Sequence, residues 1–421
     1  MKNGKIVFTI KELLYSTTAI LLFLQIYLQN YIGILQYFDE MVAVVCLLKI
    51  VYVGIIGKME KNHVNMLLLM VLTAVIGLIS NFVFELQLRP APLLTDIGNT
   101  FKVFIVYIGA SLFLKTERHK ERIVNSLFPV IRLFVVITFV CMVLHEIGIV
   151  TMGDDVRMGL ISFRFINTGA GVLSMMFYTV MLIQTLNMAL NGAKRKNIIL
   201  VLMALAVWVS TLRARAAAFV LVYLVIYWLV IIRGQKLKLN IQNGIIVLMI
   251  TAFICMDQIE YYFTSSTVAR AQLFRYGVTT MLRYFPLGSG FATFGTDAAY
   301  KYYSVLYQEY GFNSIWGLSQ QYGFFSHDTY WPAIFAQFGL FGAICMAGTV
   351  FIMCKDILKK TKHNKFCFLA GMFTVFTQVL SSAATATFFH YVTAGLFFVV
   401  PLLFGTGFQK KEGIGQQWRA S

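Results

Sequence analysis

The sequence predicts an all-α integral membrane protein, and three observations lead to that class. Only 13% of the 421 residues are charged and 59% are hydrophobic, whereas soluble domains carry about 25% charged residues. Apolar runs long enough to cross a bilayer, about 20 residues each, recur along the chain, and the mean hydropathy is +0.75. The runs are continuous and do not alternate with a period of two residues, which disfavours a β-barrel.

These runs predict about 12 transmembrane helices. In order along the chain they cover 13–33, 41–57, 64–84, 99–114, 126–146, 168–190, 197–211, 215–232, 243–260, 333–353, 366–382 and 387–406. The first run follows a basic N-terminus and continues to about Leu35 without a small-residue cleavage site. We therefore interpret it as an uncleaved span and not as a signal peptide.

The distribution of lysine and arginine predicts the orientation of the spans. Cytoplasmic loops of membrane proteins are enriched in these residues. Of the 35 Lys and Arg residues, 23 fall in the N-terminal segment and the alternate loops that follow it, and nine fall in the intervening loops. Both termini are therefore predicted to be cytoplasmic. The net charge of +17 reflects this asymmetry, and no nucleic-acid partner is expected.

A long segment on the predicted outer side separates the ninth and tenth spans. It is rich in tyrosine and carries few charges, whereas a disordered linker is polar and poor in aromatic residues. A folded, partly helical cap is therefore expected, with an interfacial amphipathic helix near 272–285. The predicted organisation is residues 1–257 with transmembrane helices 1–9, the cap at 258–332, and residues 333–421 with helices 10–12 and a cytoplasmic tail.

No cofactor and no metal are expected. The six cysteines lie in or beside apolar runs and form no CxxC pair, so we interpret them as packing residues and not as disulfide or zinc ligands. Asp154 and Asp155 could hold a metal ion. No further carboxylate cluster lies close to them in the sequence, which favours a solvated loop or pairing with arginine.

Arginine dominates the cations on the predicted outer side, where it accounts for eight of the nine. Arg213 and Arg215 lie in the short turn between spans seven and eight. A charge at this depth costs several kcal/mol unless it faces water, lipid phosphate or a bound anion. Snorkelling to lipid headgroups is one interpretation; anion binding in a central cavity is the one we favour, since the flanking alanines let neighbouring helices approach closely.

Other outer arginines are candidates for the same role. Arg157 and Arg164 lie in the loop after span five, and Arg270 and Arg275 lie in the cap. Arginine suits phosphate because it donates paired hydrogen bonds and keeps its charge, although some of these residues are expected to be ordinary surface cations. The nearby Gly288–Gly290 sequence lacks the strand and third glycine of a dinucleotide site. It predicts a tight turn.

His327 and Asp328 stand near the end of the cap. An outward-facing histidine beside a carboxylate can accept the proton of a hydroxyl nucleophile. A lone histidine is more often structural, and both interpretations stay open on spacing alone. His390, expected near the outer membrane face, is a weaker candidate.

These residues together resemble the O-antigen polymerase/ligase superfamily of bacterial enzymes that act on lipid-linked glycans. The order of the motifs, the topology and the long late outer loop are similar over essentially the whole chain. The likeness lies in Arg157–Gly169, the Arg213/Arg215 turn, Arg270–Gly290, and His327-Asp328-x-Tyr330 leading to Gly339-Leu340-Phe341-Gly342. The family usually has His-Asn where this chain has His327-Asp328. Its turn arginine usually follows serine whereas Arg215 follows alanine, so Arg213 and Arg215 are both candidates for it.

The resemblance implies a metal-independent glycosyltransferase with a GT-C-like membrane fold, in the bacterial cytoplasmic membrane. Its donor would be an undecaprenyl-diphosphate-linked oligosaccharide, bound through its diphosphate by Arg213, Arg215, Arg270, Arg275, Arg157 and Arg164. The catalytic residues would be His327 as the base and Asp328 as the group that orients it. Membrane lipids, and the chain-length regulator and flippase of the same pathway, are the further partners it implies.

Within this family we expect a polymerase that joins repeat units into capsular, O-antigen or exopolysaccharide on the outer membrane face. Divergence of this degree is typical of polymerases, because each meets a different repeat unit. An O-antigen ligase is the first alternative. A polyprenyl-glycan flippase or another transporter is the second. A transporter would need charged residues near the middle of its spans, and only Lys49, Lys102 and Arg132 are placed there.

Overall fold

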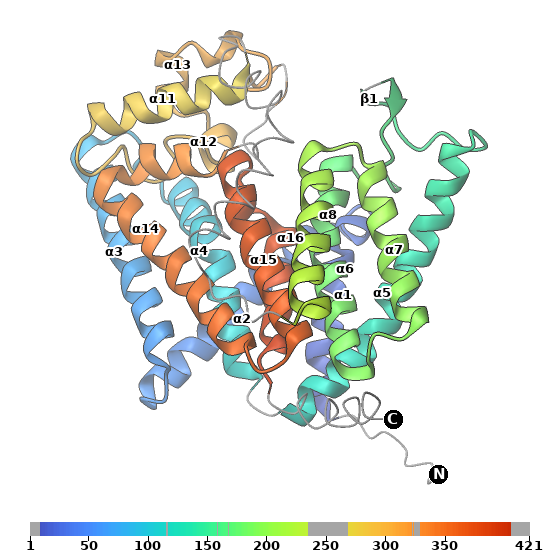
Figure 1. The fold of residues 1–421 in the computed structure, drawn as a ribbon. Coiled ribbons are helices and arrows are strands. Elements are labelled where there is room, and N and C mark those ends of the chain that lie inside the picture. The colour runs from blue at the N-terminus through green and yellow to red at the C-terminus, as the bar shows by residue number, and fades with distance from the viewer. Residues whose placement is uncertain are drawn as a thin grey trace.

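The computed structural model describes residues 9–114, 117–157, 159–166, 168–234, 268–321, 323 and 329–405. Over these residues the fold is helical (Figure 1), which confirms the all-α class. The one sheet in this part of the chain is a short antiparallel pair, β1 (Val156–Arg157) and β2 (Leu160–Ile161). Its helices are α1 (Ile10–Leu28), α2 (Phe38–Ile55), α3 (Lys61–Phe84), α4 (Pro90–Phe113), α5 (Glu117–Glu146), α6 (Ala170–Asn191), α7 (Arg195–Ser210), α8 (Ala214–Tyr227), α11 (Ala269–Arg283), α12 (Asp297–Lys301), α13 (Val305–Glu309), α14 (Trp331–Thr361), α15 (Lys365–Ala384) and α16 (Tyr391–Val399), with short η helices between some of them.

Helices occupy every predicted span except 243–260, which lies outside the described residues. Seven of the described helices are long and apolar enough to cross a membrane: α3, α4, α5, α6, α8 with the π-helical turn that follows it, α14 and α15. A helix of 24 residues, such as α3, is about 36 Å long at 1.5 Å per residue, which exceeds the roughly 30 Å hydrocarbon core. The predicted number of twelve spans and their orientation stay predictions.

The helices differ in what surrounds them. Of the apolar stretch of α6, 94% is buried inside the protein, against 28% for α3. The helices at the periphery of the bundle instead expose large apolar side chains, such as Phe82 on α3 and Leu133 on α5. A helix that is apolar all round needs either protein or lipid around it. Here α6 is enclosed by protein, while α3 and α5 present the apolar surface that a bilayer would cover.

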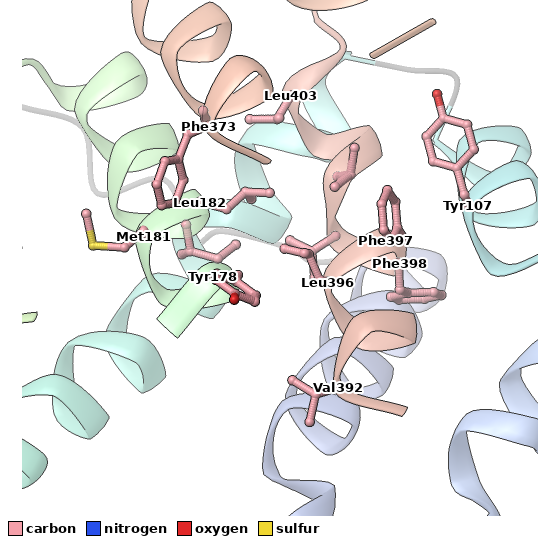
Figure 2. Packing of buried hydrophobic residues seen from close by; sticks show 14 of the residues in the cluster. Tyr107, Tyr178, Met181, Leu182, Phe373, Val392, Leu396, Phe397, Phe398 and Leu403 are labelled. Carbon is pink, nitrogen blue, oxygen red and sulfur yellow. The ribbon is translucent and has the colours of Figure 1, made fainter. Parts of the chain in front are cut away.

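The short helix α16 fills the space between α6, α1 and α4. Figure 2 shows Leu396 on the side of Leu182, and Phe397 towards Tyr107 of α4. The rings of Phe397 and Tyr107 meet edge to face with centroids 6.1 Å apart, an arrangement that aromatic pairs favour. This contact joins elements almost three hundred residues apart in the sequence.

Helix α14 is longer than predicted and is broken at Gly339, whose φ is 59° and ψ −158°. The turn that follows Pro286 lies against this break. Leu340 N donates to Pro286 O at 3.1 Å, and Gly290 N donates to Gln337 O at 2.8 Å. A Cβ on Gly339 would stand 2.2 Å from Pro286 O. The two glycine-containing motifs therefore meet backbone to backbone, which only residues without a side chain allow.

The same turn is fixed to α3 by Asn81, a residue only 2% exposed. Its amide nitrogen donates to Phe291 O at 3.0 Å. Its amide oxygen accepts from Phe291 N at 2.7 Å. Next to it, Ala292 N donates to Asp96 Oδ2 at 2.6 Å. The end of α3 and the start of α4 thus hold the base of the cap through buried hydrogen bonds.

Replacing Asn81 by alanine is expected to destabilise the protein by about 2–4 kcal/mol, because it leaves a buried N–H and a buried C=O of Phe291 without partners. Thermal unfolding in detergent and limited proteolysis of the cap measure the effect. Thr95→Ala is the matched control, since that exposed hydroxyl donates to Ala91 O within its own helix. Equal stability and equal protease resistance of Asn81→Ala and the control would contradict this role.

The described part of the cap has its own core. Helices α11, α12 and α13 enclose a cluster separate from the main one, and α11 packs on α14 (Figure 1). Tyr307 is fully buried there, and its hydroxyl oxygen accepts a hydrogen bond from Gly295 N at 2.8 Å. Burial raises the pKa of the Tyr307 hydroxyl. Several of the cap's tyrosines therefore fill this core, while Trp316 is 69% exposed.

Candidate functional site: an arginine cluster on the turn between α7 and α8

The loop that links α5 to α6 lies on the turn between α7 and α8. Phe163 N donates to Ser210 O at 2.9 Å, which fixes the loop to the end of α7. On the other side, His145 of α5 accepts from Met152 N at 3.1 Å and contacts Ile161 O at 3.0 Å. Phe163 is fully buried. These anchors bring the arginines of the loop to those of the turn.

Asp155 joins the two segments. Its Oδ2 atom lies 2.9 Å from Nε of Arg157 and 3.3 Å from Nη2 of Arg213. In the same loop, Asp154 pairs with Arg164 at 3.0 Å. The interpretation of the two aspartates as arginine partners agrees with these contacts. The pairing of Asp155 with Arg213 was not predicted, because the two residues are 58 positions apart and no sequence pattern connects them.

Arg215 lies in the first turn of α8 and is half-buried. Its Nη2 donates to Gly171 O at the start of α6, at 3.1 Å. Its Nη1 is buried and has no hydrogen-bond partner among the described residues. A buried N–H of a charged group that lacks an acceptor lowers the stability of the folded protein, because the group has lost its water without gaining a hydrogen bond. Ala216 and Ala218 beside it are fully buried, so the helices approach closely here.

We define the arginine cluster as Arg157, Arg164, Arg213 and Arg215 with the partners Asp154 and Asp155. These six side chains carry four positive and two negative charges, so the cluster has a net charge of +2. Two of its members, Arg213 and Arg215, lie at the N-terminal end of the long apolar helix α8. Because its guanidinium groups outnumber its carboxylates, the cluster has the chemistry to bind an anion such as a phosphate or diphosphate group.

The two cap arginines lie elsewhere. Arg270 is half-buried in the first turn of α11 and Arg275 is exposed, with its guanidinium carbon 6.0 Å from the centroid of the Tyr276 ring. Figure 1 shows α11 above α3 and α14, while β1 and the turn between α7 and α8 lie on the other half of the protein. Arg283 pairs with Glu309 at 2.5 Å. The structure thus places Arg157 and Arg213 on one carboxylate, holds Arg164 and Arg215 on the same two packed segments, and leaves Arg270 and Arg275 on a separate element.

The predicted catalytic pair, His327 and Asp328, lies outside the described residues. The residues that follow are firmly packed. Tyr330 is fully buried against Phe388 and Phe389, and Trp331 Nε1 donates to Ser382 Oγ at 3.1 Å. His390 is buried and its Nδ1 accepts from Val392 N, which makes it the N-cap of α16.

One group of potential metal ligands occurs among the described residues, at the opposite end of α3 from Asn81. Ligand atoms of Glu60, His63 and Asp356 lie within 4.8 Å of one another. The ammonium group of Lys360 lies 2.6 Å from Glu60 and 2.9 Å from Asp356. Tyr107 also donates to Asp356, at 2.6 Å. Lys360 therefore pairs with both carboxylates, and the group forms an ion-pair network between the start of α3 and the last turns of α14.

Comparison with protein-family models gives no match to this chain, and no curated protein matches its sequence.

Proposed function

We propose that the protein is a polymerase that joins undecaprenyl-diphosphate-linked oligosaccharide repeat units into a capsular, O-antigen or exopolysaccharide. The observation that carries this proposal is the arginine cluster. It combines a net charge of +2 with a buried guanidinium donor on Arg215 that has no partner among the described residues. A lipid diphosphate places its charge at the membrane surface, level with the end of a spanning helix such as α8.

The chemistry assigns a task to each group. An acceptor hydroxyl attacks the anomeric carbon of the donor, and the bond from that carbon to the diphosphate oxygen breaks. The hydroxyl proton passes to His327, which Asp328 orients, and the diphosphate leaves on its polyprenyl carrier. Negative charge grows on the diphosphate as this bond breaks, and fixed guanidinium groups stabilise it without reorganisation. Direct attack of this kind inverts the anomeric centre.

The finer features of the fold belong to the same proposal. The chain would have about 12 transmembrane helices in a GT-C-like arrangement, with both termini cytoplasmic and the cap outside. The seven long apolar helices and the excess of lysine and arginine in alternate loops support this arrangement. The outer face is where a polymerase would meet its lipid-linked substrate.

The direct test uses the purified full-length protein in nanodiscs with undecaprenyl-diphosphate-linked repeat units, in the presence and absence of a chelator. A ladder of lengthening lipid-linked products, unchanged by the chelator, is expected. Transfer to a separate lipopolysaccharide-core acceptor without chain growth would identify a ligase instead. Movement of the substrate across the membrane without any new glycosidic bond would identify a transporter. A reporter fused near Tyr303 that reads cytoplasmic would also contradict the proposal.

A further inference from the structure

A cavity of about 650 Å³ lies between α1, α2, α4 and α5, in a part of the protein that the proposed reaction does not use. Its walls are mainly apolar, from residues such as Leu14, Tyr15, Val45, Cys46, Leu112 and Phe113. Its charged lining residues are Lys11, Glu12, Lys49 and His119. The apolar walls suit the acyl chain of a lipid, and the cationic residues at one end suit an anionic headgroup.

The cavity opens towards the side of the helix bundle. Leu14, Met41 and Val45 line it, and each of these side chains is more than half exposed on the outer apolar surface. An occupant that enters there passes through the medium around the helices, which is hydrocarbon if α2 lies in a bilayer. The opening therefore favours a molecule with an apolar chain over a water-soluble one.

The charge at the polar end is positive. Lys49 is half-buried in α2. Its ammonium group lies 5.2 Å from the centroid of the Tyr52 ring and 5.5 Å from that of the Phe113 ring. No carboxylate among the described residues forms an ion pair with it. The one lining carboxylate, Glu12, lies 2.6 Å from His119 and 3.3 Å from Arg122. Lys11 is exposed at the same end. A cation inside an apolar helix bundle is costly unless an anion or water meets it.

The length of the cavity supports the same occupant. Its lining on α2 runs from Phe38 to Lys49, which is about 16 Å at 1.5 Å per residue. Half of the roughly 30 Å hydrocarbon core is about 15 Å. A chain that begins at Lys49 and ends at Phe38 would therefore have about the length of the acyl chains in one leaflet.

We propose that this cavity binds an anionic phospholipid. The phosphate contacts Lys49 and Lys11, and one acyl chain lies along α2 as far as Phe38. The phosphate end of the site, marked by Lys11 and Lys49, points towards the end of the bundle that carries the chain's N-terminal segment, which is predicted to be cytoplasmic. It is independent of the arginine cluster and of the proposed reaction.

The test measures lipid binding to the full-length protein in mild detergent by native mass spectrometry and by thermal stabilisation. Phosphatidylglycerol is expected to bind and to raise the unfolding temperature. Phosphatidylcholine with the same chains and free glycerol phosphate are expected to have little effect. Lys49→Gln should weaken phosphatidylglycerol binding about tenfold or more, the usual cost of losing a charged hydrogen bond. Val45→Trp, which fills the cavity without changing charge, should also prevent binding.

Lys58→Gln is the matched control, because Lys58 lies just beyond α2 and does not line the cavity; its affinity should equal that of the wild type. Equal binding of the two phospholipids would overturn the proposal, as would unchanged affinity in Lys49→Gln. Binding of undecaprenyl phosphate but not phosphatidylglycerol would overturn it too, and would assign the cavity to the carrier lipid. Circular dichroism and gel filtration verify that each variant is folded.

Discussion

Arg215→Ala is expected to slow polymer formation by about a hundredfold or more, the scale of losing one fixed donor to a developing negative charge. Arg215 is held by Gly171 O at 3.1 Å and keeps a second, buried donor group without a partner among the described residues. Arg215→Lys should restore little activity, because an ammonium group lacks the planar pair of donors that grips phosphate. The rate of chain growth by purified protein is the measurement.

The control for Arg215 is Arg283→Ala. Arg283 also lies on the predicted outer side, but it is half-exposed and paired with Glu309, so its loss should leave the rate close to that of the wild type.

Removing Arg213 and Arg215 together, or Arg270 alone, should abolish polymer while the protein stays in the membrane. Full polymer from these variants would assign the arginines to lipid headgroups instead.

His327→Ala is expected to lower the rate by about a hundredfold or more, the usual contribution of a positioned general base. Binding of the lipid-linked donor should hardly change, because the arginines hold the diphosphate. Asp328→Asn should have a milder effect, since Asp328 orients the imidazole and does not accept the proton. Donor affinity and single-turnover rate, measured separately, distinguish the two residues.

His363→Gln serves as the control for His327, because His363 lies in a predicted cytoplasmic loop with its Nδ1 2.9 Å from Lys360 O. It should retain full activity. An equal loss of donor binding and turnover in His327→Ala would make His327 a residue that positions substrate or supports folding. A wild-type rate in that variant would remove it from the mechanism.

The candidate site was predictable in part. Arg213 and Arg215 stood out because two charges flank a short turn between apolar runs, and this is a local feature of the sequence. Their neighbours were not predictable in the same way. Asp155 meets Arg213 only because Phe163 fixes the loop to the end of α7, and the carbonyl of Gly171 carries no side-chain signal at all.

The sequence by itself determined the helical class and the positions of most helices. A run such as 64–84 satisfies its backbone hydrogen bonds within itself, so its hydropathy alone predicts α3 to within a few residues. Only the tertiary structure decided that α6 is enclosed by protein while α3 faces outwards. It also decided that α14 breaks at Gly339, where Gly288 approaches it. The sharing of one carboxylate by Arg157 and Arg213 is likewise a tertiary feature. These features depend on contacts between residues far apart in the chain, and such contacts arise from the packing of all the helices together.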